Sequence, residues 1–139
     1  DVREGQRRFP RKAQYAGLPC LHRRVVSLDA WAKELGAAIT VCDRDGVIVA
    51  MNDKSARTFE ADGGRALIGT NMLDCHPEPA RTTLASLLAE PRVNAYTIEK
   101  RGVRKQIYQA PWYENGQYRG LVELSLELPT PMPHFVRQG

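Results

Sequence analysis

Cysteine is scarce in this chain, and the cysteines present do not form a recognisable set. Cys20, Cys42 and Cys75 are odd in number and lie far apart in the 139-residue sequence. This spacing supports neither a disulfide framework nor a paired-cysteine zinc site. We therefore expect reduced and mostly buried thiols, as in a cytoplasmic protein.

Long apolar runs are also missing. No run approaches the roughly 18 residues of a membrane span, and the first 24 residues lack the apolar core of a signal peptide. We expect no membrane association and a cytoplasmic location. With 42% hydrophobic residues, the chain still has enough apolar material for the core of one ordinary domain. Its start at Asp1 rather than methionine is compatible with a fragment of a longer protein, with the effector or partner domain elsewhere.

The sequence patterns typical of catalysis are absent as well. His22, His76 and His134 lie in predicted loops or tails, with no serine or cysteine motif around them. A nucleophile, a base and an orienting group cannot be assembled from them. No phosphate-binding glycine loop occurs either. The sequence therefore predicts a binding protein rather than an enzyme.

Positive charge is concentrated at the N-terminus. Residues 1–24 hold seven basic and two acidic residues, a balance of +5, whereas the rest of the chain has a balance of −1. Glycines and prolines interrupt this stretch, so we predict an irregular basic extension. Such an arm can contact nucleic acid or an acidic partner. Because no helix-turn-helix and no interleaving of aromatic and basic residues accompanies it, a solvated linker is the simpler interpretation.

Residues 25–36 predict a short amphipathic helix. Ser27 is a candidate N-cap, Asp29 suits the first turn, and Gly36 supplies the stop. The helix either covers a sheet face in its own chain or pairs with the same helix of a second subunit. The sequence leaves both alternatives open. The apolar face comprises Leu28, Trp31, Ala32 and Leu35, and the candidate dimer-interface residues are Leu28, Trp31 and Leu35.

A β-hairpin followed by a helix is predicted from Ile39 to Asn52. Two runs rich in β-branched residues, 39–42 and 47–51, flank a polar turn that contains Gly46. Asn52 can cap the next helix by accepting a backbone N–H through its side-chain oxygen. The rest of the chain must cover this hairpin or extend it.

Short helical segments are predicted next. Residues 53–60 form one segment, which breaks at Asp62-Gly63-Gly64, and residues 65–74 form a second, irregular one. A longer helix follows His76-Pro77-Glu78-Pro79 and ends before Pro91. Its apolar face comprises Ala80, Leu84, Leu87 and Leu88.

The last third of the chain is rich in predicted strands. Residues 93–100, 103–112 and 118–128 are separated by Arg101-Gly102 and by a turn with Asn115-Gly116, which indicates three consecutive antiparallel strands. In the last strand leucine and valine alternate with polar residues, so one face is buried and the other is largely polar. Residues 129–139 carry three prolines and predict an extended tail, from which Met132 and Phe135 pack back on the body.

Three motifs in this order resemble the PAS family over residues 37–128. ITVCDRDGVIVAMN resembles the first two PAS strands with their Asp-x-x-Gly turn and terminal asparagine, IGTNMLDCHPE resembles the segment before the long PAS helix, and GQYRGLVELSLEL resembles the closing strand. The ending, from Tyr108 to Arg137, more narrowly resembles bacterial PAS modules found alone or after hemerythrin-like domains. The resemblance implies an α+β fold in which short helices pack on one face of a five-stranded antiparallel sheet.

The resemblance also implies a role in sensing or interaction, in signal transduction or transcriptional regulation. A small ligand of undetermined identity would lie between the sheet and the short helices, and the outer face of the sheet would form a homodimer. The prolines from Pro129 onward exclude a helical linker at the C-terminus, so output is expected through residues 25–35 or by direct contact. The candidate ligand-binding residues are Asn52, Phe59, Met72, Leu84, Leu88, Tyr96, Tyr108 and Gln109, and strand alternation permits only one of the last two to face inward.

Haem binding through His76 is an alternative function, as is contact with nucleic acid through the basic arm. Some PAS proteins bind haem through a histidine, but the expected position lies inside the long helix, and residues 80–89 contain none. The resemblance places His76 in the loop before that helix. Cys75 beside it is either an ordinary semi-buried thiol or a redox-sensitive one.

Overall fold

The structure is a computed structural model that describes residues 27–139. The predicted basic extension, residues 1–24, and Cys20 lie outside the described residues. Five strands form one antiparallel sheet: β1 (Ala38–Asp43), β2 (Ile48–Met51), β3 (Asn94–Lys100), β4 (Val103–Glu114) and β5 (Gln117–Leu128). The helical segments are α1 (Ala30–Lys33), α2 (Asp53–Thr58), η1 (Glu60–Asp62), η2 (Gly64–Leu67), α3 (Met72–Cys75) and α4 (Ala80–Ala89).

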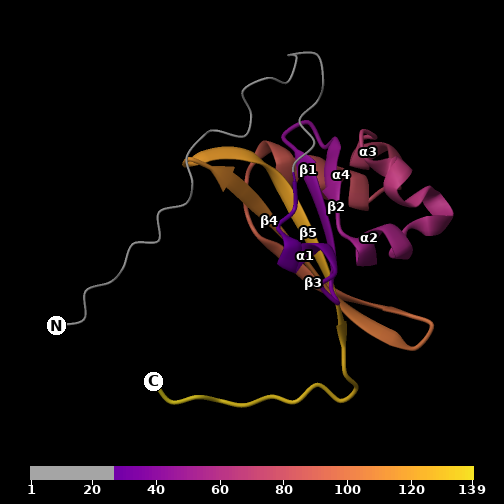
Figure 1. The fold of residues 1–139 in the computed structure, drawn as a ribbon. Coiled ribbons are helices and arrows are strands. Elements are labelled where there is room, and N and C mark those ends of the chain that lie inside the picture. The colour runs from indigo at the N-terminus through magenta and orange to yellow at the C-terminus, as the bar shows by residue number, and fades with distance from the viewer. Residues whose placement is uncertain (1–26) are drawn as a thin grey trace.

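The sheet joins the two ends of the domain. Its strand order is β2-β1-β5-β4-β3, so the first hairpin pairs with the last strand (Figure 1). β1 and β5 run antiparallel over six residue pairs, from Ala38 opposite Ser125 to Asp43 opposite Gly120. The predicted α+β fold with a five-stranded antiparallel sheet is confirmed.

Tight turns set the length of the last three strands. Arg101-Gly102 and Asn115-Gly116 both have positive φ at each residue, 52° and 76° in the first turn and 53° and 78° in the second. This geometry matches the twist of the flanking strands and needs only two residues. Because the second loop is that short, β4 and β5 extend to Glu114 and from Gln117, beyond the predicted ends.

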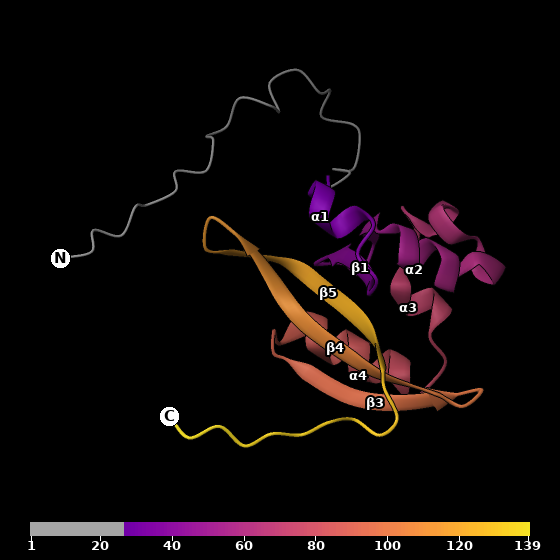
Figure 2. The same ribbon diagram turned by 60° about the horizontal axis from the view of Figure 1, so that its bottom comes forward.

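The helical segments between β2 and β3 lie on one side of the sheet, which we call the inner face (Figures 1 and 2). The predicted short segments between the hairpin and the long helix are confirmed as α2, η1, η2 and α3, and the ten-residue α4 is the longest helix among residues 27–139. No helix in this range is long and apolar enough to cross a membrane. The inner core comprises Cys42, Ile48, Met51, Met72, Leu84, Leu87, Leu88 and Leu121.

The N-terminal helix is shorter than predicted. Residues 25–36 were expected to be helical, and 25–26 lie outside the described residues. Within residues 27–36, α1 spans four residues, is preceded by Asp29 rather than Ser27 as its N-cap, and ends before Gly36. The chain leaves the helix early because it must enter β1 at Ala38, where the sheet already fixes its direction.

Only part of the predicted apolar helix face is buried. Ala32 is 3% exposed and Leu28 packs on the outer face of the sheet. Trp31 and Leu35 are 69% and 42% exposed. The outer cluster comprises Ala32, Ile39, Val41, Val49 and Ala50, with Leu28, Trp112, Val122 and Leu124 packed against it.

The tail, residues 129–139, leaves the sheet at the end of β5 and runs below the domain in the view of Figure 1. The prediction that Met132 and Phe135 pack back on the body is wrong, because their side chains are 54% and 71% exposed. Prolines recur at every second position from 129 to 133, so the chain cannot donate the backbone hydrogen bonds that would extend β5 back along the sheet.

Gly120 marks the closest approach of β5 to β1. A Cβ at this position would lie 2.0 Å from the carbonyl oxygen of Cys42 and 2.7 Å from the carbonyl carbon of Asp43. The same carbonyl of Cys42 accepts a 2.9 Å hydrogen bond from Nε1 of Trp112, so it is held from the other side. The atoms that a Cβ at Gly120 would meet are therefore backbone atoms of β1, which have little freedom to move.

We therefore predict that Gly120→Ala lowers the free energy of unfolding by about 2–4 kcal/mol, through overpacking and an unfavourable positive φ. Chemical denaturation followed by circular dichroism measures this change. Gly36→Ala is the control, because a Cβ there meets no atom within 4 Å. A Gly120→Ala protein as stable as the control would contradict the prediction.

Candidate functional site

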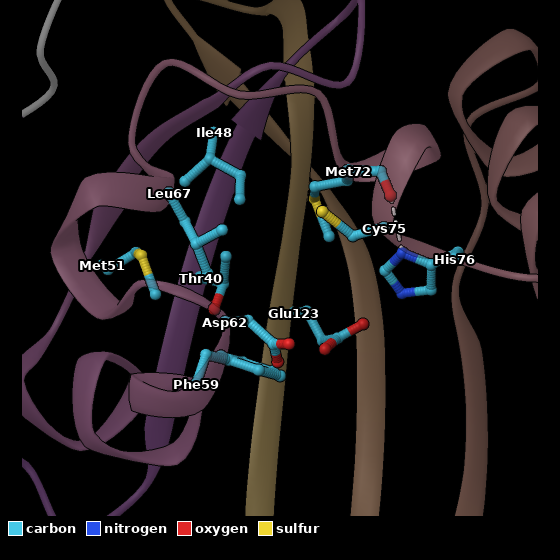
Figure 3. Close-up of a pocket in the computed structure, with 10 residues that line it drawn as sticks. All are labelled: Thr40, Ile48, Met51, Phe59, Asp62, Leu67, Met72, Cys75, His76 and Glu123. Carbon is cyan, nitrogen blue, oxygen red and sulfur yellow. Dashed lines mark hydrogen bonds between the residues drawn. The ribbon is translucent and has the colours of Figure 1, made fainter.

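A pocket lies between the inner face of the sheet and the helical segments that follow Asn52. Its volume is about 330 Å³, at the lower end of the range for small-molecule sites. Strands β1, β2 and β5 supply one wall, and the chain from Phe59, just after α2, to His76, just after α3, supplies the other (Figure 3). Ten residues line it: Thr40, Ile48, Met51, Phe59, Asp62, Leu67, Met72, Cys75, His76 and Glu123.

The pleat of the central strands determines which side chains reach the pocket. Thr40 and Glu123 are paired across β1 and β5, and both line the pocket. Along β5, Leu121 belongs to the inner core, whereas Val122 and Leu124 pack in the outer cluster. Beyond Leu121, the polar residues of β5 therefore face the helices, and Val122 and the leucines from Leu124 onward face the other side of the sheet.

Glu123 is oriented by two amide side chains. Nε2 of Gln109 donates to Oε2 of Glu123 over 2.8 Å, and Oε1 of Gln109 accepts from Nδ2 of Asn94 over 2.9 Å. Because a carboxylate only accepts hydrogen bonds, it fixes the orientation of the Gln109 amide and, through it, that of Asn94. Within residues 27–139, Oε1 of Glu123 has no hydrogen-bond partner, so it remains available to a molecule in the pocket.

The inner face of the sheet disfavours further negative charge. Burial raises the pKa of the Cys42 thiol to about 11, and the charges of Asp43 and Glu123 add to this effect. Burial also raises the pKa of Tyr96, and Glu123 raises it further. Cys42 is fully buried and Tyr96 lies at the edge of the same face, so at neutral pH both are uncharged groups of the protein body.

His76 lies in the loop before α4, as predicted, and also lines the pocket. Its Nδ1 lies 2.6 Å from the carbonyl oxygen of Met72, and because that oxygen only accepts, Nδ1 carries a proton (Figure 3). In the neutral ring Nε2 is then an acceptor, and none of residues 27–139 donates to it. Cys75, whose thiol is free, lies beside it in the pocket lining.

Asn52 caps α2 as predicted, and both the oxygen and the nitrogen of its side-chain amide make internal hydrogen bonds. Its Oδ1 accepts from the backbone N–H groups of Ile39 and Ser55, over 2.9 and 3.0 Å. Its Nδ2 donates to the carbonyls of Ala32 and Ala37, over 3.0 and 2.7 Å. The side chain is fully buried. The structure therefore places Asn52 behind the pocket lining, where its four hydrogen bonds leave none for a ligand.

The predicted apolar ligand-binding residues fall into three places. Phe59 and Met72 line the pocket. Leu84 lies in the inner core with 2% of its surface exposed. Leu88 borders a second, shallower groove on the other side of the first hairpin turn, next to Arg44 and Tyr118.

The predicted polar residues on β3 and β4 are also separated. Gln109 faces inward and supports Glu123 without lining the pocket. Tyr108 stands opposite Leu124 on the outer face, as alternation requires once Gln109 faces inward. Tyr96 pairs with Ile107 on the inner face but is 45% exposed, near the edge of the sheet.

Sequence reasoning did not include most of the polar groups of the pocket. The missed lining residues are Thr40, Ile48, Met51, Asp62, Leu67, Cys75 and Glu123. The alternation along β5 marked Glu123 as part of a polar face, but only the pairing of β1 with β5 shows that this face points at the helices. Within residues 27–139, no group of three or more His, Cys, Asp or Glu side chains could hold a metal ion.

Comparison with known families gives one match. The PAS fold family matches residues 33–128, which is more than half of the chain. Curated proteins, in contrast, yield no significant match to this sequence.

Solved structures show the same fold at low identity. A PAS domain of an HTR-like protein from Haloarcula marismortui is 14% identical with a TM-score of 0.52, over 71% of this chain and 92% of that one. The PAS domain of BvgS from Bordetella pertussis is 18% identical with a TM-score of 0.51, over 70% and 81%. The Aer2 receptor from Vibrio cholerae, described as a dual PAS-haem oxygen sensor, is 15% identical with a TM-score of 0.50, over 67% and 95%.

The hydrogen bonds of Asn52 lead to a stability prediction. Asn52→Ala leaves two buried N–H groups and two buried carbonyls without this partner, so we expect the free energy of unfolding to fall by about 3–5 kcal/mol. Asn52→Asp keeps the acceptor but replaces the donor with an oxygen that faces two carbonyls, and should be at least as damaging. Urea denaturation of both variants tests this. Near-normal stability of Asn52→Ala, combined with loss of ligand binding, would instead assign Asn52 to the binding site.

Proposed function

The chain belongs to the PAS-fold family, and on this premise we propose that it is a sensory module of a signalling protein whose pocket binds a small molecule. The observation that carries this proposal is the pocket between the sheet and α2–α3, with a carboxylate at its sheet side that is held in one orientation. Apolar walls with a few fixed polar groups are the usual composition of a small-molecule site.

Binding rather than turnover is the function that these groups support. His76 and Cys75 are consecutive in the chain, but His76 holds its Nδ1 proton on the Met72 carbonyl, and no hydrogen bond joins the two side chains within the described residues. A nucleophile activated by an adjacent base would need such a contact. We therefore propose a receptor and not an enzyme.

The route of output in this proposal leads from the pocket to α1. Met51 lines the pocket, and the next residue, Asn52, holds the carbonyl of Ala32 in α1. Asp53 adds a second link, because its carboxylate pairs with Lys33 of α1 over 3.4 Å and with Arg65 of η2. A ligand that displaces β2 or α2 thus acts on the bonds that position α1.

Haem is the alternative ligand, because Nε2 of His76 has no partner among residues 27–139 and could coordinate iron. The other residues that line the pocket do not suit haem. Haem carries two negatively charged propionates, and the pocket presents the carboxylates of Asp62 and Glu123. Among the described residues no lysine or arginine lines it. Haem sensing is therefore not proposed. Contact with nucleic acid would use residues 1–24, which lie outside the described residues, and nothing in residues 27–139 adds support to it.

We further propose that the outer face of the sheet pairs with a second copy of the chain. In Figure 2, α4 lies on one side of β3–β5. On the other side, among residues 27–139, the α1 segment covers only part of the sheet and leaves the rest uncovered. Leu124, Leu126 and Leu128 of β5 point to that uncovered side and are only partly buried. Trp31 and Leu35 of the α1 segment add further exposed apolar surface. A two-fold pairing would bury this apolar surface on both copies.

The ligand proposal predicts that filling the pocket abolishes binding. Leu67 lines the pocket and is partly buried, so Leu67→Trp should occupy the space without opening the core. Compounds found in a small-molecule screen to raise the melting temperature of the wild-type chain should lose most of that effect in Leu67→Trp, since stabilisation follows ligand affinity. Thermal denaturation with and without compound measures it.

The control for this substitution is Val93→Trp, an exposed site outside the pocket, which should respond to compounds as the wild type does. If no compound stabilises the wild type, or if Leu67→Trp responds as strongly as Val93→Trp, the pocket is not a ligand site.

The dimer proposal predicts that a charge on the outer face separates the copies. Trp31→Glu and Leu126→Glu should each raise the dimer dissociation constant at least tenfold, measured by sedimentation equilibrium over a range of concentrations. Ile98→Glu on the edge strand β3, 39% exposed and on the inner side of the sheet, is the matched control. A wild-type chain that is monomeric at every concentration, or dimers unaffected by both changes, would disprove the pairing.

A further inference from the structure

The polar groups of the pocket have one chemical property in common. Glu123 and Asp62 bring carboxylates, and His76, whose Nδ1 donates to the carbonyl of Met72, also lines the pocket. In the described chain, lysine and arginine are absent from the lining. Figure 3 shows both carboxylates directed into the space between the sheet and the helices. The pocket is therefore rich in acceptors and negative charge, and poor in donors.

Glu123 is the better placed of the two carboxylates. It lies at the centre of the sheet, and the hydrogen-bonded series Asn94, Gln109, Glu123 fixes its Oε2, while Oε1 has no partner among residues 27–139. Gln109 is only 5% exposed, so the support lies inside the protein. An acceptor that is already oriented loses little conformational entropy when a ligand donates to it, which favours binding.

The negative charge in the pocket is not neutralised within the described residues. The nearby ion pairs within these residues involve neither Glu123 nor Asp62. Lys33 and Arg65 pair with Asp53, and Lys54 pairs with Glu127. Asp62 is exposed and solvated, but Glu123 is partly buried between the sheet and the helices. A cation in the pocket would supply the missing counter-charge for Glu123.

The remaining walls suit an apolar body. Ile48, Leu67 and the two methionines Met51 and Met72 supply aliphatic and thioether surface, and Phe59 supplies an aromatic ring. Methionine adapts to irregular ligands, and an aromatic face attracts a nearby cation. The volume of about 330 Å³ limits the ligand to a small molecule.

We propose that the pocket binds a small organic cation, a protonated amine with an apolar body, whose ammonium group donates to Oε1 of Glu123 and lies near Asp62. The inference rests on the proposed function, because it names the class of ligand for the same pocket. An anionic ligand is disfavoured, since both carboxylates would repel it.

Three probes of similar shape and different charge test this proposal: 2-phenylethylammonium, 2-phenylethanol and 3-phenylpropionate. The chain has three methionines, so labelling with ¹³C-methyl methionine gives three reporters in the full chain. Met51 and Met72 line the pocket, while Met132 is 54% exposed in the tail and serves as an internal reference. The ammonium probe should shift the first two signals and leave the third unchanged, with at least tenfold higher affinity than the alcohol.

Glu123→Gln removes the charge while its amide oxygen can still accept from Gln109. We expect it to lower affinity for the ammonium probe at least tenfold and to leave binding of the alcohol within about twofold. Glu127→Gln is the matched control, four residues further along β5 on the same face, outside the pocket and paired with Lys54 over 3.3 Å. It should bind all three probes as the wild type does.

The outcomes separate the ligand class from the function. If the alcohol or the carboxylate shifts Met51 and Met72 as strongly as the ammonium probe, or if Glu123→Gln binds the ammonium probe unchanged, the cation is overturned and the ligand pocket stands. If none of the probes binds, but screened compounds stabilise the wild type and lose this stabilisation in Leu67→Trp, the cation is likewise overturned and the ligand pocket stands. If no compound of any class stabilises the chain, both the cation and the proposed function fail.

Discussion

Four hydrogen bonds of the Asn52 side chain connect the N-terminal helix, the first strand and the helix that follows the first hairpin. They reach α1 through Ala32, the entry to β1 through Ala37 and Ile39, and the first turn of α2 through Ser55. An amide has two donors and two lone-pair directions, and all are used. Because the residue is fully buried, water cannot replace any of these bonds at low cost. The positions of α1, the sheet and the pocket wall are therefore coupled at one residue.

The central strand β5 gives the domain its two different faces. Leu124, Leu126 and Leu128 point away from α2–α4, while Leu121 and Glu123 point toward them. An ordinary half-buried sheet places its apolar side under the helices, and this arrangement is reversed along the middle of β5. The reversal has two physical consequences. A polar group under the helices needs support, which Gln109 and Asn94 provide, and an apolar row on the other side needs cover, of which α1 provides only part.

Local features of the fold were predictable because their causes are local. The Asn115-Gly116 turn, the cap at Asn52 and the apolar face of α4 each depend on residues within one or two turns of chain. The structure confirms the turn, the cap and the three leucines of the α4 face, whereas Ala80, also predicted on that face, is exposed at the first residue of the helix. The extent of α1 was not predictable, because it depends on where β1 joins a strand almost 80 residues later. Glu123 was missed for the same reason, since alternation separates two faces without saying which one the helices cover.

The site also shows why residues chosen for their type need not bind. Gln109 and Asn52 have the polar side chains expected of a binding site, yet both are used by the protein to position other groups. Three groups of the pocket have no hydrogen-bond partner among residues 27–139: Oε1 of Glu123, Nε2 of His76 and the carboxylate of Asp62. The acceptors without a partner, rather than the number of polar residues, therefore indicate the charge of the ligand that the pocket would bind. Since Met51 lines that pocket and Asn52 follows it directly, a ligand that moves the strand end acts on the bonds that hold α1.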